Sequence, residues 1–259
     1  MGGKRSILEA GGVDDEASSA MAARGDRALI SRALIAMLTV GSVMTLSAWH
    51  ASRQLHFGSG YSWKSLLVFA LGAALLLPSL RAHHPFARLG PANTVTLVRA
   101  SLVALLAALI GEQAPIAPLT ATILATLVIA MDGCDGWLAR RTHMGSAFGA
   151  RFDMETDAAL VAVLAVLAWQ FGKVGAWVLL SGAMRYFYAA AAAFIPLLRH
   201  PLPPGYRGKT IAVIQMLALL VAVAPWASPA LASVVALIGL ACLTLSFALD
   251  IVWLVRYAT

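Results

Sequence analysis

Apolar residues recur along the chain in eight segments, each long enough for a helix that crosses a bilayer core of about 30 Å. Short polar or basic stretches separate these segments, and Pro and Gly break the link RHPLPPGYRGK between the sixth and the seventh. The predicted helices cover residues 30–50, 63–80, 93–111, 117–141, 146–171, 174–197, 209–226 and 229–256. The pattern therefore predicts an all-α polytopic membrane protein.

Composition agrees with a membrane protein. Hydrophobic residues make up 60% of the chain and charged residues only 12%, whereas an ordinary soluble domain has about 25% charged residues. The segment 1–27 differs from the rest because it is polar, mixed in charge and without a hydrophobic stretch. We expect this segment to be a disordered tail rather than a cleavable signal.

Positive charges indicate the orientation. If the N-terminus is cytoplasmic, thirteen Lys and Arg residues fall on the cytoplasmic side and three, Arg53, Lys64 and Lys173, on the other. This distribution accounts for the net charge of +7 without a nucleic-acid partner. It predicts that both termini are cytoplasmic, and the Ala-rich composition favours a bacterial cytoplasmic membrane.

The stretch MDGCDGWLARRTHMGSAFGARFDMETD, residues 131–157, contains five of the twelve acidic residues. Asp132 and Asp135 share one stripe of the fourth predicted helix, and Asp153 and Asp157 share one stripe of the fifth. The link between these helices is short enough to place them antiparallel. We therefore expect four carboxylates to converge at the cytoplasmic surface, with Glu155 on another face and solvated.

Four converging carboxylates repel each other and require cations. Hard oxygen ligands without His or Cys favour Mg²⁺, Mn²⁺ or Ca²⁺ over zinc. Pairs of such ions are common where a displacement takes place at phosphorus. Small residues at 136, 139 and 149 leave space for a bulky ligand, and Arg140 adds a cation that suits phosphate.

The stretch resembles the signature of the CDP-alcohol phosphatidyltransferases. It reads Asp132-x-x-Asp135-Gly136-x-x-Ala139-Arg140, then eight residues, then Gly149-x-x-x-Asp153-x-x-x-Asp157. Weaker elements support the resemblance: Pro91-Ala-Asn93-Thr94 followed by Arg99, and Gly208-Lys209 followed by Gln215, although Ala212 stands where the family often has Thr.

The resemblance implies a membrane transferase of phospholipid biosynthesis. A hydroxyl acceptor would attack CDP-diacylglycerol at a site with two divalent cations, Mg²⁺ or Mn²⁺, and CMP would leave. The implied metal ligands are Asp132, Asp135, Asp153 and Asp157, with Asp157 also the base. The implied nucleotide-binding residues are Asn93, Thr94, Gly136, Ala139, Arg140 and Gly149. The resemblance also makes a homodimer plausible.

It further implies a division of the chain. A six-helix catalytic core would cover residues 91–259, preceded by an extension of two transmembrane helices at 28–90 and by the tail 1–27. The extension has no counterpart in the family core.

The acceptor is less defined by the sequence. A basic rim of Arg185, Arg207 and Lys209 suits a phosphorylated alcohol, and glycerol 3-phosphate is our leading acceptor. Inositol phosphate would suit the same charges, and serine or another polar alcohol remains open, because Tyr186 follows Arg185 where some phosphatidylglycerol-phosphate synthases have an acid. Asp250 in the last helix has no assigned partner.

A protein of another class, a cation transporter, would also use intramembrane aspartates. The transporter hypothesis predicts carboxylates spread along a path across the membrane, whereas those of residues 131–157 cluster at the cytoplasmic end of the predicted helices. A catalytically inactive scaffold of the same fold would have lost an aspartate of the signature, and none is replaced.

Overall fold

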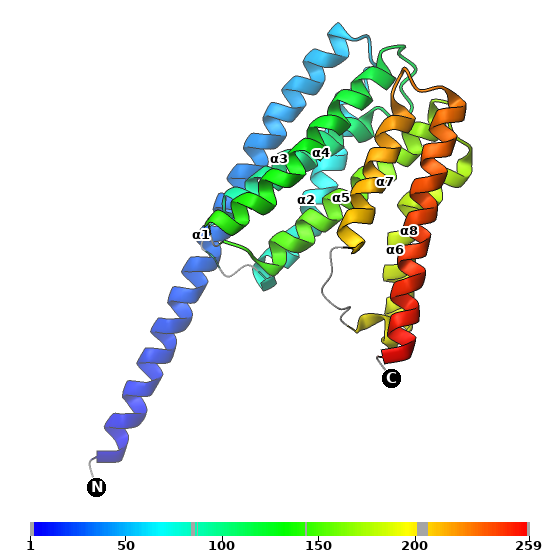
Figure 1. The fold of residues 1–259 in the computed structure, drawn as a ribbon. Coiled ribbons are helices and arrows are strands. Elements are labelled where there is room, and N and C mark those ends of the chain that lie inside the picture. Colours follow the sequence, from blue (N-terminus) through cyan, green and yellow to red (C-terminus); the bar gives the residue numbers. More distant parts are fainter. Residues whose placement is uncertain (1–2, 84–85, 87, 143, 201–206, 258–259) are drawn as a thin grey trace.

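The computed structural model describes residues 3–83, 86, 88–142, 144–200 and 207–257, and every secondary-structure element within them is a helix (Figure 1). Two 3₁₀ segments, η1 (Ala176–Val178) and η2 (Pro196–Arg199), flank α6. The eight α-helices are α1 (Gly3–Gln54), α2 (Tyr61–His83), α3 (Pro91–Ala108), α4 (Ala117–Thr142), α5 (Ala147–Gln170), α6 (Leu179–Phe194), α7 (Arg207–Val223) and α8 (Pro229–Tyr257). The predicted all-α class is confirmed.

Four of the helices are long and apolar enough to cross a membrane. They are Ala28–Gln54 within α1, Tyr61–Leu80 within α2, Pro91–Ala108 and Pro229–Tyr257. The apolar part of α4 is shorter, Ala117–Gly133, α6 and α7 have 16 and 17 residues, and α5 carries the charges of residues 151–157. The chain is thus an integral membrane protein with four candidate spans, and eight crossings remain a prediction.

The segment 3–27 differs from the expected disordered tail, because it continues α1 as helix. Much of this segment consists of Ala, Glu, Lys and Arg, which are strong helix formers, and Pro is absent from it. Once the apolar part of α1 has formed, each further residue adds a hydrogen bond without a new nucleation step. The N-terminal part of α1 extends beyond the other helices (Figure 1).

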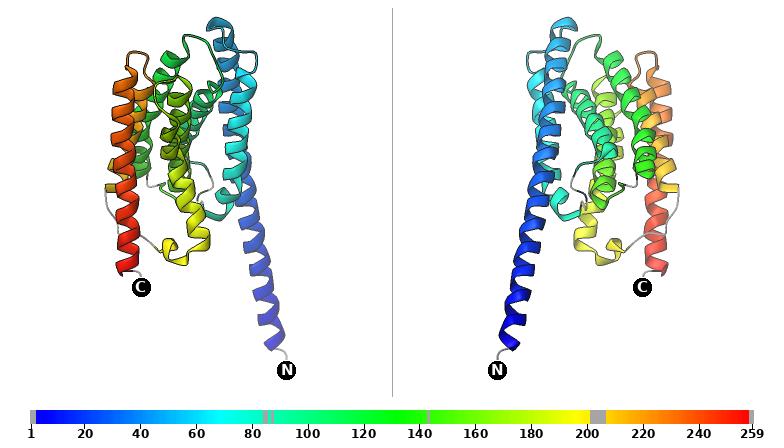
Figure 2. Two further views of the ribbon diagram at one scale, coloured as in Figure 1. Left: turned by 90° about the vertical axis from the view of Figure 1, so that its right-hand side faces the viewer. Right: turned by 90° about the vertical axis from the view of Figure 1, so that its left-hand side faces the viewer.

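Helices α3 and α5 lie at the centre of the bundle. Helix α3 packs against α1, α2, α4 and α5, and α5 packs against α3, α6 and α7. Figure 2 shows α1 and α2 on one side of the bundle and α8 on the other. Fully buried leucines from α3, α5 and α7, among them Leu106, Leu160 and Leu219, form the main core and fix how these helices sit against each other.

The N-terminal helices are attached to α3 at the end of the bundle where α3 terminates. Lys64 of α2 donates to Glu112 Oε1 over 2.9 Å and to the Ile110 carbonyl over 3.1 Å. The Gly58 N–H donates to Glu112 Oε2 over 2.6 Å, and the Tyr61 hydroxyl donates to the Leu105 carbonyl. Buried Glu112 is thus paired and hydrogen-bonded, as a charge in such surroundings must be.

Helices α5 and α6 approach each other closely at Gly182. A Cβ atom there would lie 2.6 Å from the Ala162 Cα, so the backbones would have to separate. We expect Gly182→Ala to lower the free energy of unfolding by about 1–3 kcal/mol, measured by thermal unfolding in detergent. Gly72→Ala in α2 is the matched control, because a Cβ at Gly72 meets no atom within 4 Å. Equal stability of the two variants would contradict the close contact.

Candidate active site

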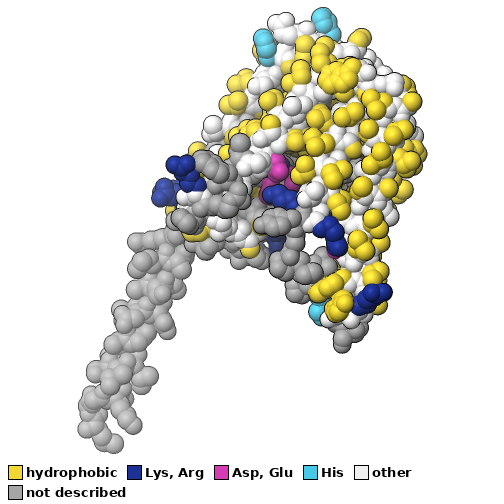
Figure 3. All heavy atoms as spheres, in the orientation of Figure 1, with side chains coloured by type: hydrophobic (Ala, Val, Ile, Leu, Met, Phe, Trp, Pro, Cys, Tyr) yellow, Lys and Arg dark blue, Asp and Glu magenta, His cyan; other side chains and the backbone are white. Residues whose placement is uncertain are grey.

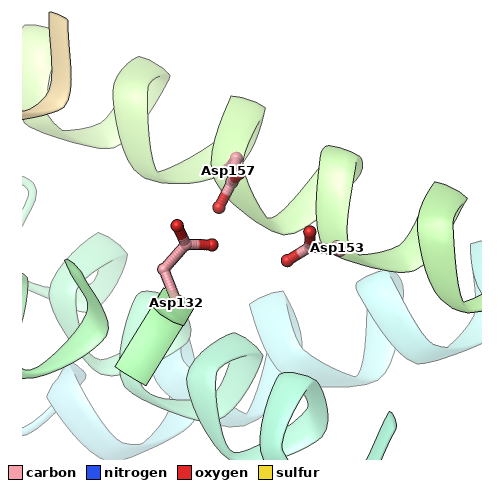
Figure 4. A group of neighbouring side chains, drawn as sticks. All are labelled: Asp132, Asp153 and Asp157. Atoms are coloured by element: carbon pink, nitrogen blue, oxygen red, sulfur yellow. The ribbon is translucent and has the colours of Figure 1, made fainter. Parts of the chain in front are cut away.

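Three aspartates from two helices meet at the end of the bundle near both termini. Asp132 of α4 and Asp153 and Asp157 of α5 each offer a carboxylate oxygen, and these oxygens lie within 4.8 Å of one another (Figure 4). The i, i+4 spacing places Asp153 and Asp157 on one stripe of α5, facing Asp132. The predicted convergence is therefore found for three of the four aspartates.

The fourth predicted ligand, Asp135, lies on α4 one turn after Asp132. Its side chain, like those of Ala139 and Arg140, falls outside the part of the structure that is described.

The start of α5 is fixed by a cap and by a close contact with α3. The Ser146 hydroxyl accepts a hydrogen bond from the Gly149 N–H over 3.0 Å, which satisfies one of the free donors of the first turn. A Cβ at Gly149 would lie 2.5 Å from Asn93 Oδ1, so a larger residue at position 149 would require the Asn93 side chain to move. The Asn93 amide in turn donates to the Leu89 carbonyl over 2.6 Å.

Arg99 of α3 lies among the three aspartates and is completely buried. Its Nη1 donates to Asp153 Oδ1 over 2.6 Å, and its Nη2 contacts Asp157 Oδ1 at 2.5 Å and Asp132 Oδ1 at 3.0 Å. The guanidinium thus supplies positive charge where carboxylates would otherwise repel each other. The sequence placed Arg99 near the nucleotide but did not pair it with the aspartates, although an arginine in an apolar segment signals such a role.

A cavity of about 180 Å³ lies beside Asp153, between α3, α4 and the start of α5. Asn93, Gly136 and Gly149, three of the predicted nucleotide-binding residues, line it. Thr94 does not: its side chain is exposed and donates to the Gly90 carbonyl. Thr96, which the sequence pattern did not single out, is buried and lines the cavity instead. Thr94 and Thr96 lie on different faces of α3, because a step of two residues turns a helix by about 200°.

A larger cavity of about 400 Å³ lies on the other side of the aspartates, bounded by α5, α6, α7 and α8. Asp132, Asp153 and Asp157 line it together with two of the predicted acceptor residues, Arg185 and Lys209. In the space-filling view, acidic side chains lie in a hollow with basic side chains around it, below a surface rich in hydrophobic side chains (Figure 3).

Acids partner two of the three predicted acceptor cations. Arg185 Nη2 lies 2.5 Å from Glu155 Oε1. The sequence predicted a solvated Glu155, and the structure shows instead that Glu155 forms an ion pair. Arg207 pairs with Asp250, which gives Asp250 the partner that the sequence left unassigned. Asp250 lines the larger cavity, whereas Arg207 itself does not. Lys209 is exposed and has no ion pair with a described residue.

The donor atoms suit a divalent cation. The three carboxylates offer only oxygen ligands, are partly buried and converge within the distance that a shared ion requires. Imidazole and thiolate groups, which would favour zinc or copper, are absent from this cluster among the described residues. The cluster could therefore hold Mg²⁺ or Mn²⁺.

An all-helical membrane protein with such a cluster beside two cavities has the features of an enzyme that acts on a phosphorylated lipid. Residues 89–247 match the family model of the CDP-alcohol phosphatidyltransferases, and the match covers more than half of the 259 residues. The chain belongs to this family. No curated protein and no solved structure matches it.

Membership makes the protein a CDP-alcohol phosphatidyltransferase, a transferase of phospholipid synthesis. The family implies CDP-diacylglycerol and an alcohol acceptor as substrates and uses divalent cations, which the aspartate cluster could bind. The cation transporter suggested as a rival class is thereby set aside, since the match covers the aspartates themselves.

Proposed function

We propose that this protein transfers the phosphatidyl group of CDP-diacylglycerol to glycerol 3-phosphate, forming phosphatidylglycerol phosphate and CMP. One observation carries the proposal: three convergent aspartates line the same cavity as Lys209, a cation that has no ion pair among the described residues. An acceptor whose phosphate lies at Lys209 can present its hydroxyl to the aspartates.

The four aspartates have distinct roles in this reaction. Asp132, Asp135, Asp153 and Asp157 would hold two divalent cations, and these would supply positive charge for the diphosphate oxygens and for the leaving CMP. Asp157 accepts the proton of the acceptor hydroxyl. The hydroxyl oxygen then bonds to the phosphorus that carries diacylglycerol, and the bond from this phosphorus to the oxygen of CMP breaks.

The smaller cavity is suited to the nucleotide. Asn93, Gly136 and Gly149 line it, and Ala139 and Arg140 follow on α4. The buried Thr96 offers a further hydroxyl there. With the nucleotide on one side of the aspartates and the acceptor on the other, the transferred phosphorus lies between them, as an in-line displacement requires.

The architecture supports a division of labour within the chain. Helices α3–α8, residues 91–259, form the catalytic core, and the family match from residue 89 to residue 247 agrees with these limits. Helices α1 and α2 form an extension anchored at Glu112. The N-terminal ends of α1 and α5 and the C-terminal end of α8 lie at the same end of the bundle (Figures 1 and 2), and Asp153 lies in the second turn of α5. We place this end in the cytoplasm, where soluble acceptors and cations are available, and we expect a homodimer.

An acceptor panel tests the proposal. Purified protein is incubated with CDP-diacylglycerol, Mn²⁺ and either glycerol 3-phosphate, inositol phosphate, serine or no acceptor, and CMP and the lipid product are measured. We expect CMP release that depends on glycerol 3-phosphate. CMP release with only one of the other acceptors would show that glycerol 3-phosphate is not the acceptor. Cation flux without CMP release would overturn the proposal that the protein is an enzyme.

The charge of Lys209 should determine acceptor affinity. We expect Lys209→Met to raise the KM for glycerol 3-phosphate by roughly tenfold, because a charge-assisted hydrogen bond to phosphate contributes about 1.5–3 kcal/mol. The KM for CDP-diacylglycerol should change little. Arg256→Met is the control, since it removes an exposed cation at the end of α8 that does not line the cavity. An equal rise in both KM values would contradict an acceptor role.

A further inference from the structure

Two polar side chains in the larger cavity have no hydrogen-bond partner among the residues that the structure describes. Gln215 of α7 is 1% exposed, and neither its amide nitrogen nor its amide oxygen is bonded to a described residue. Ser181 of α6 is 3% exposed, and its hydroxyl is likewise unpaired within the described part of the chain. Both residues line the cavity that contains Asp157.

Such groups are unfavourable unless something binds them. A buried donor or acceptor without a partner destabilises a fold by about 1–3 kcal/mol, and most buried polar side chains in folded proteins are bonded. Here three polar atoms at the wall of a single cavity have no partner in the described part of the chain. Other buried hydroxyls of the bundle, such as those of Ser101 and Thr122, donate to backbone carbonyls of their own helices. The difference points to a ligand at Gln215 and Ser181.

The position of these residues indicates which part of a ligand they meet. Gln215 lies six residues after Lys209 on α7, about 9 Å further into the bundle, and Ser181 lies one turn deeper on α6 than Arg185. Each helix therefore presents a cation near the mouth of the cavity and a neutral hydrogen-bonding group inside. A ligand that fits this order has an anionic end at the mouth and hydroxyl groups deeper in the cavity.

Close helix packing holds both groups in place. Gly182 brings α6 against Ala162 of α5 next to Ser181. Gly239 of α8 leaves the space that the Gln215 amide occupies, since a Cβ there would lie 2.6 Å from Gln215 Oε1. The Gln215 amide is thus packed closely against Gly239, and this contact reduces the side-chain entropy that Gln215 loses when a ligand binds.

We infer that Gln215 and Ser181 form a subsite for a second hydroxyl of the acceptor, one that does not react. This inference rests on the proposed function and names the acceptor class as a polyol phosphate. The reacting hydroxyl lies at Asp157, the phosphate lies at Lys209, and the neighbouring hydroxyl donates to and accepts from the Gln215 amide and the Ser181 hydroxyl. Sites that bond a substrate hydroxyl reject analogues that lack it, because their own polar groups are then left unpaired.

Two acceptors that differ by one hydroxyl test the subsite. Glycerol 3-phosphate has the second hydroxyl, and 3-hydroxypropyl phosphate keeps the reacting hydroxyl and the phosphate but lacks it. We expect kcat/KM of the unaltered protein to be on the order of 10²-fold lower for 3-hydroxypropyl phosphate. Equal values for the two acceptors would show that the cavity only holds water at these groups and would overturn the assignment.

Variants test whether Gln215 and Ser181 cause the difference in kcat/KM between the two acceptors. Gln215→Leu should bring the two kcat/KM values within roughly threefold of each other by lowering that of glycerol 3-phosphate. Ser181→Ala should weaken the discrimination, whereas Ser101→Ala should leave it unchanged, because the Ser101 hydroxyl bonds Val98 and lines neither cavity. Gly239→Ala, which displaces the Gln215 amide without removing it, should also weaken it. Unaltered discrimination in Gln215→Leu would overturn the assignment.

Thermal stability separates this role from a structural one. Gln215→Leu should unfold at the same or a higher temperature, since it replaces an unpaired buried amide with an apolar side chain of similar size. A structural glutamine would give the opposite result, and a clear loss of stability would count against the subsite.

The acceptor panel distinguishes the two proposals from each other. If CMP is released with inositol phosphate as the acceptor and not with glycerol 3-phosphate, the proposed acceptor is wrong and the proposed polyol subsite is retained. If serine, which has a single hydroxyl, is the acceptor, the subsite is overturned while the transferase stands. If no acceptor of the panel leads to release of CMP, both proposals are overturned.

Discussion

Replacing Asp157 with asparagine should reduce CMP release by at least about 10³-fold, because general-base catalysis alone contributes about 10²–10⁴-fold and the substitution also removes a metal ligand. The asparagine side chain would keep the size of the aspartate but could neither accept the proton of the acceptor nor neutralise a cation. The measurement is release of CMP from CDP-diacylglycerol at saturating acceptor, over a range of Mn²⁺ concentrations.

A comparison of Asp157→Asn with Asp153→Asn distinguishes the loss of a catalytic base from the loss of a metal ligand alone. Both residues line the cavity, and both belong to the cluster of oxygens within 4.8 Å. Asp153→Asn should weaken cation binding, so that part of its activity returns at high Mn²⁺, whereas Asp157→Asn should stay inactive at every concentration. Asp15→Asn, in the part of α1 beyond the bundle, serves as the matched control. An Asp157→Asn protein that retains a tenth of the activity would rule out Asp157 as the base.

Loss of the Arg99 side chain should have the largest effect on stability. Without it, the three partly buried aspartates would lose the one cation that contacts each of them among the described residues. Removing one partner of a buried ion pair destabilises by about 3–5 kcal/mol. We therefore expect Arg99→Met to lower the unfolding temperature of metal-free protein by on the order of 10 °C.

Divalent cations should restore much of that loss, because they supply the missing positive charge to the same carboxylates. The measurement is thermal unfolding of both proteins in EDTA and in Mn²⁺, and the Arg99→Met protein should gain more from Mn²⁺ than the unaltered protein does. Arg99→Lys should be intermediate, since an ammonium keeps the charge but not the planar fork that reaches three carboxylates. Equal stability of Arg99→Met and the unaltered protein in EDTA would contradict the role of Arg99.

Several parts of the site could be predicted because they depend on local geometry. The i, i+4 spacing of Asp153 and Asp157 places them on one stripe of any helix, and the short link before Ala147 keeps the start of α5 close to the end of α4. The requirement for glycine at 149 followed from the motif, and the structure adds its reason, the Asn93 side chain.

Other parts could not be predicted because they join residues far apart in the sequence. Arg99 meets the aspartates across 33 to 58 positions, and Asp250 meets Arg207 across 43. Glu155 and Arg185 are 30 positions apart and looked like independent charges. The position of Thr96 in the smaller cavity, with Thr94 exposed, could not be predicted for a related reason, since the sequence of α3 does not state which of its faces meets α4 and α5.

The sequence by itself determined the all-helical membrane class, the family and the identity of the acidic cluster, because helix formation and motif spacing are local and a bilayer restricts spanning segments mainly to helices. Only the tertiary structure decided which cations the acids meet and which threonine lines the smaller cavity. It also decided that Gln215 and Ser181, without hydrogen-bond partners among the described residues, line the same cavity as Asp157. These outcomes depend on how α3, α5, α6 and α7 rotate against each other, and contacts such as those at Gly149, Gly182 and Gly239 set that rotation.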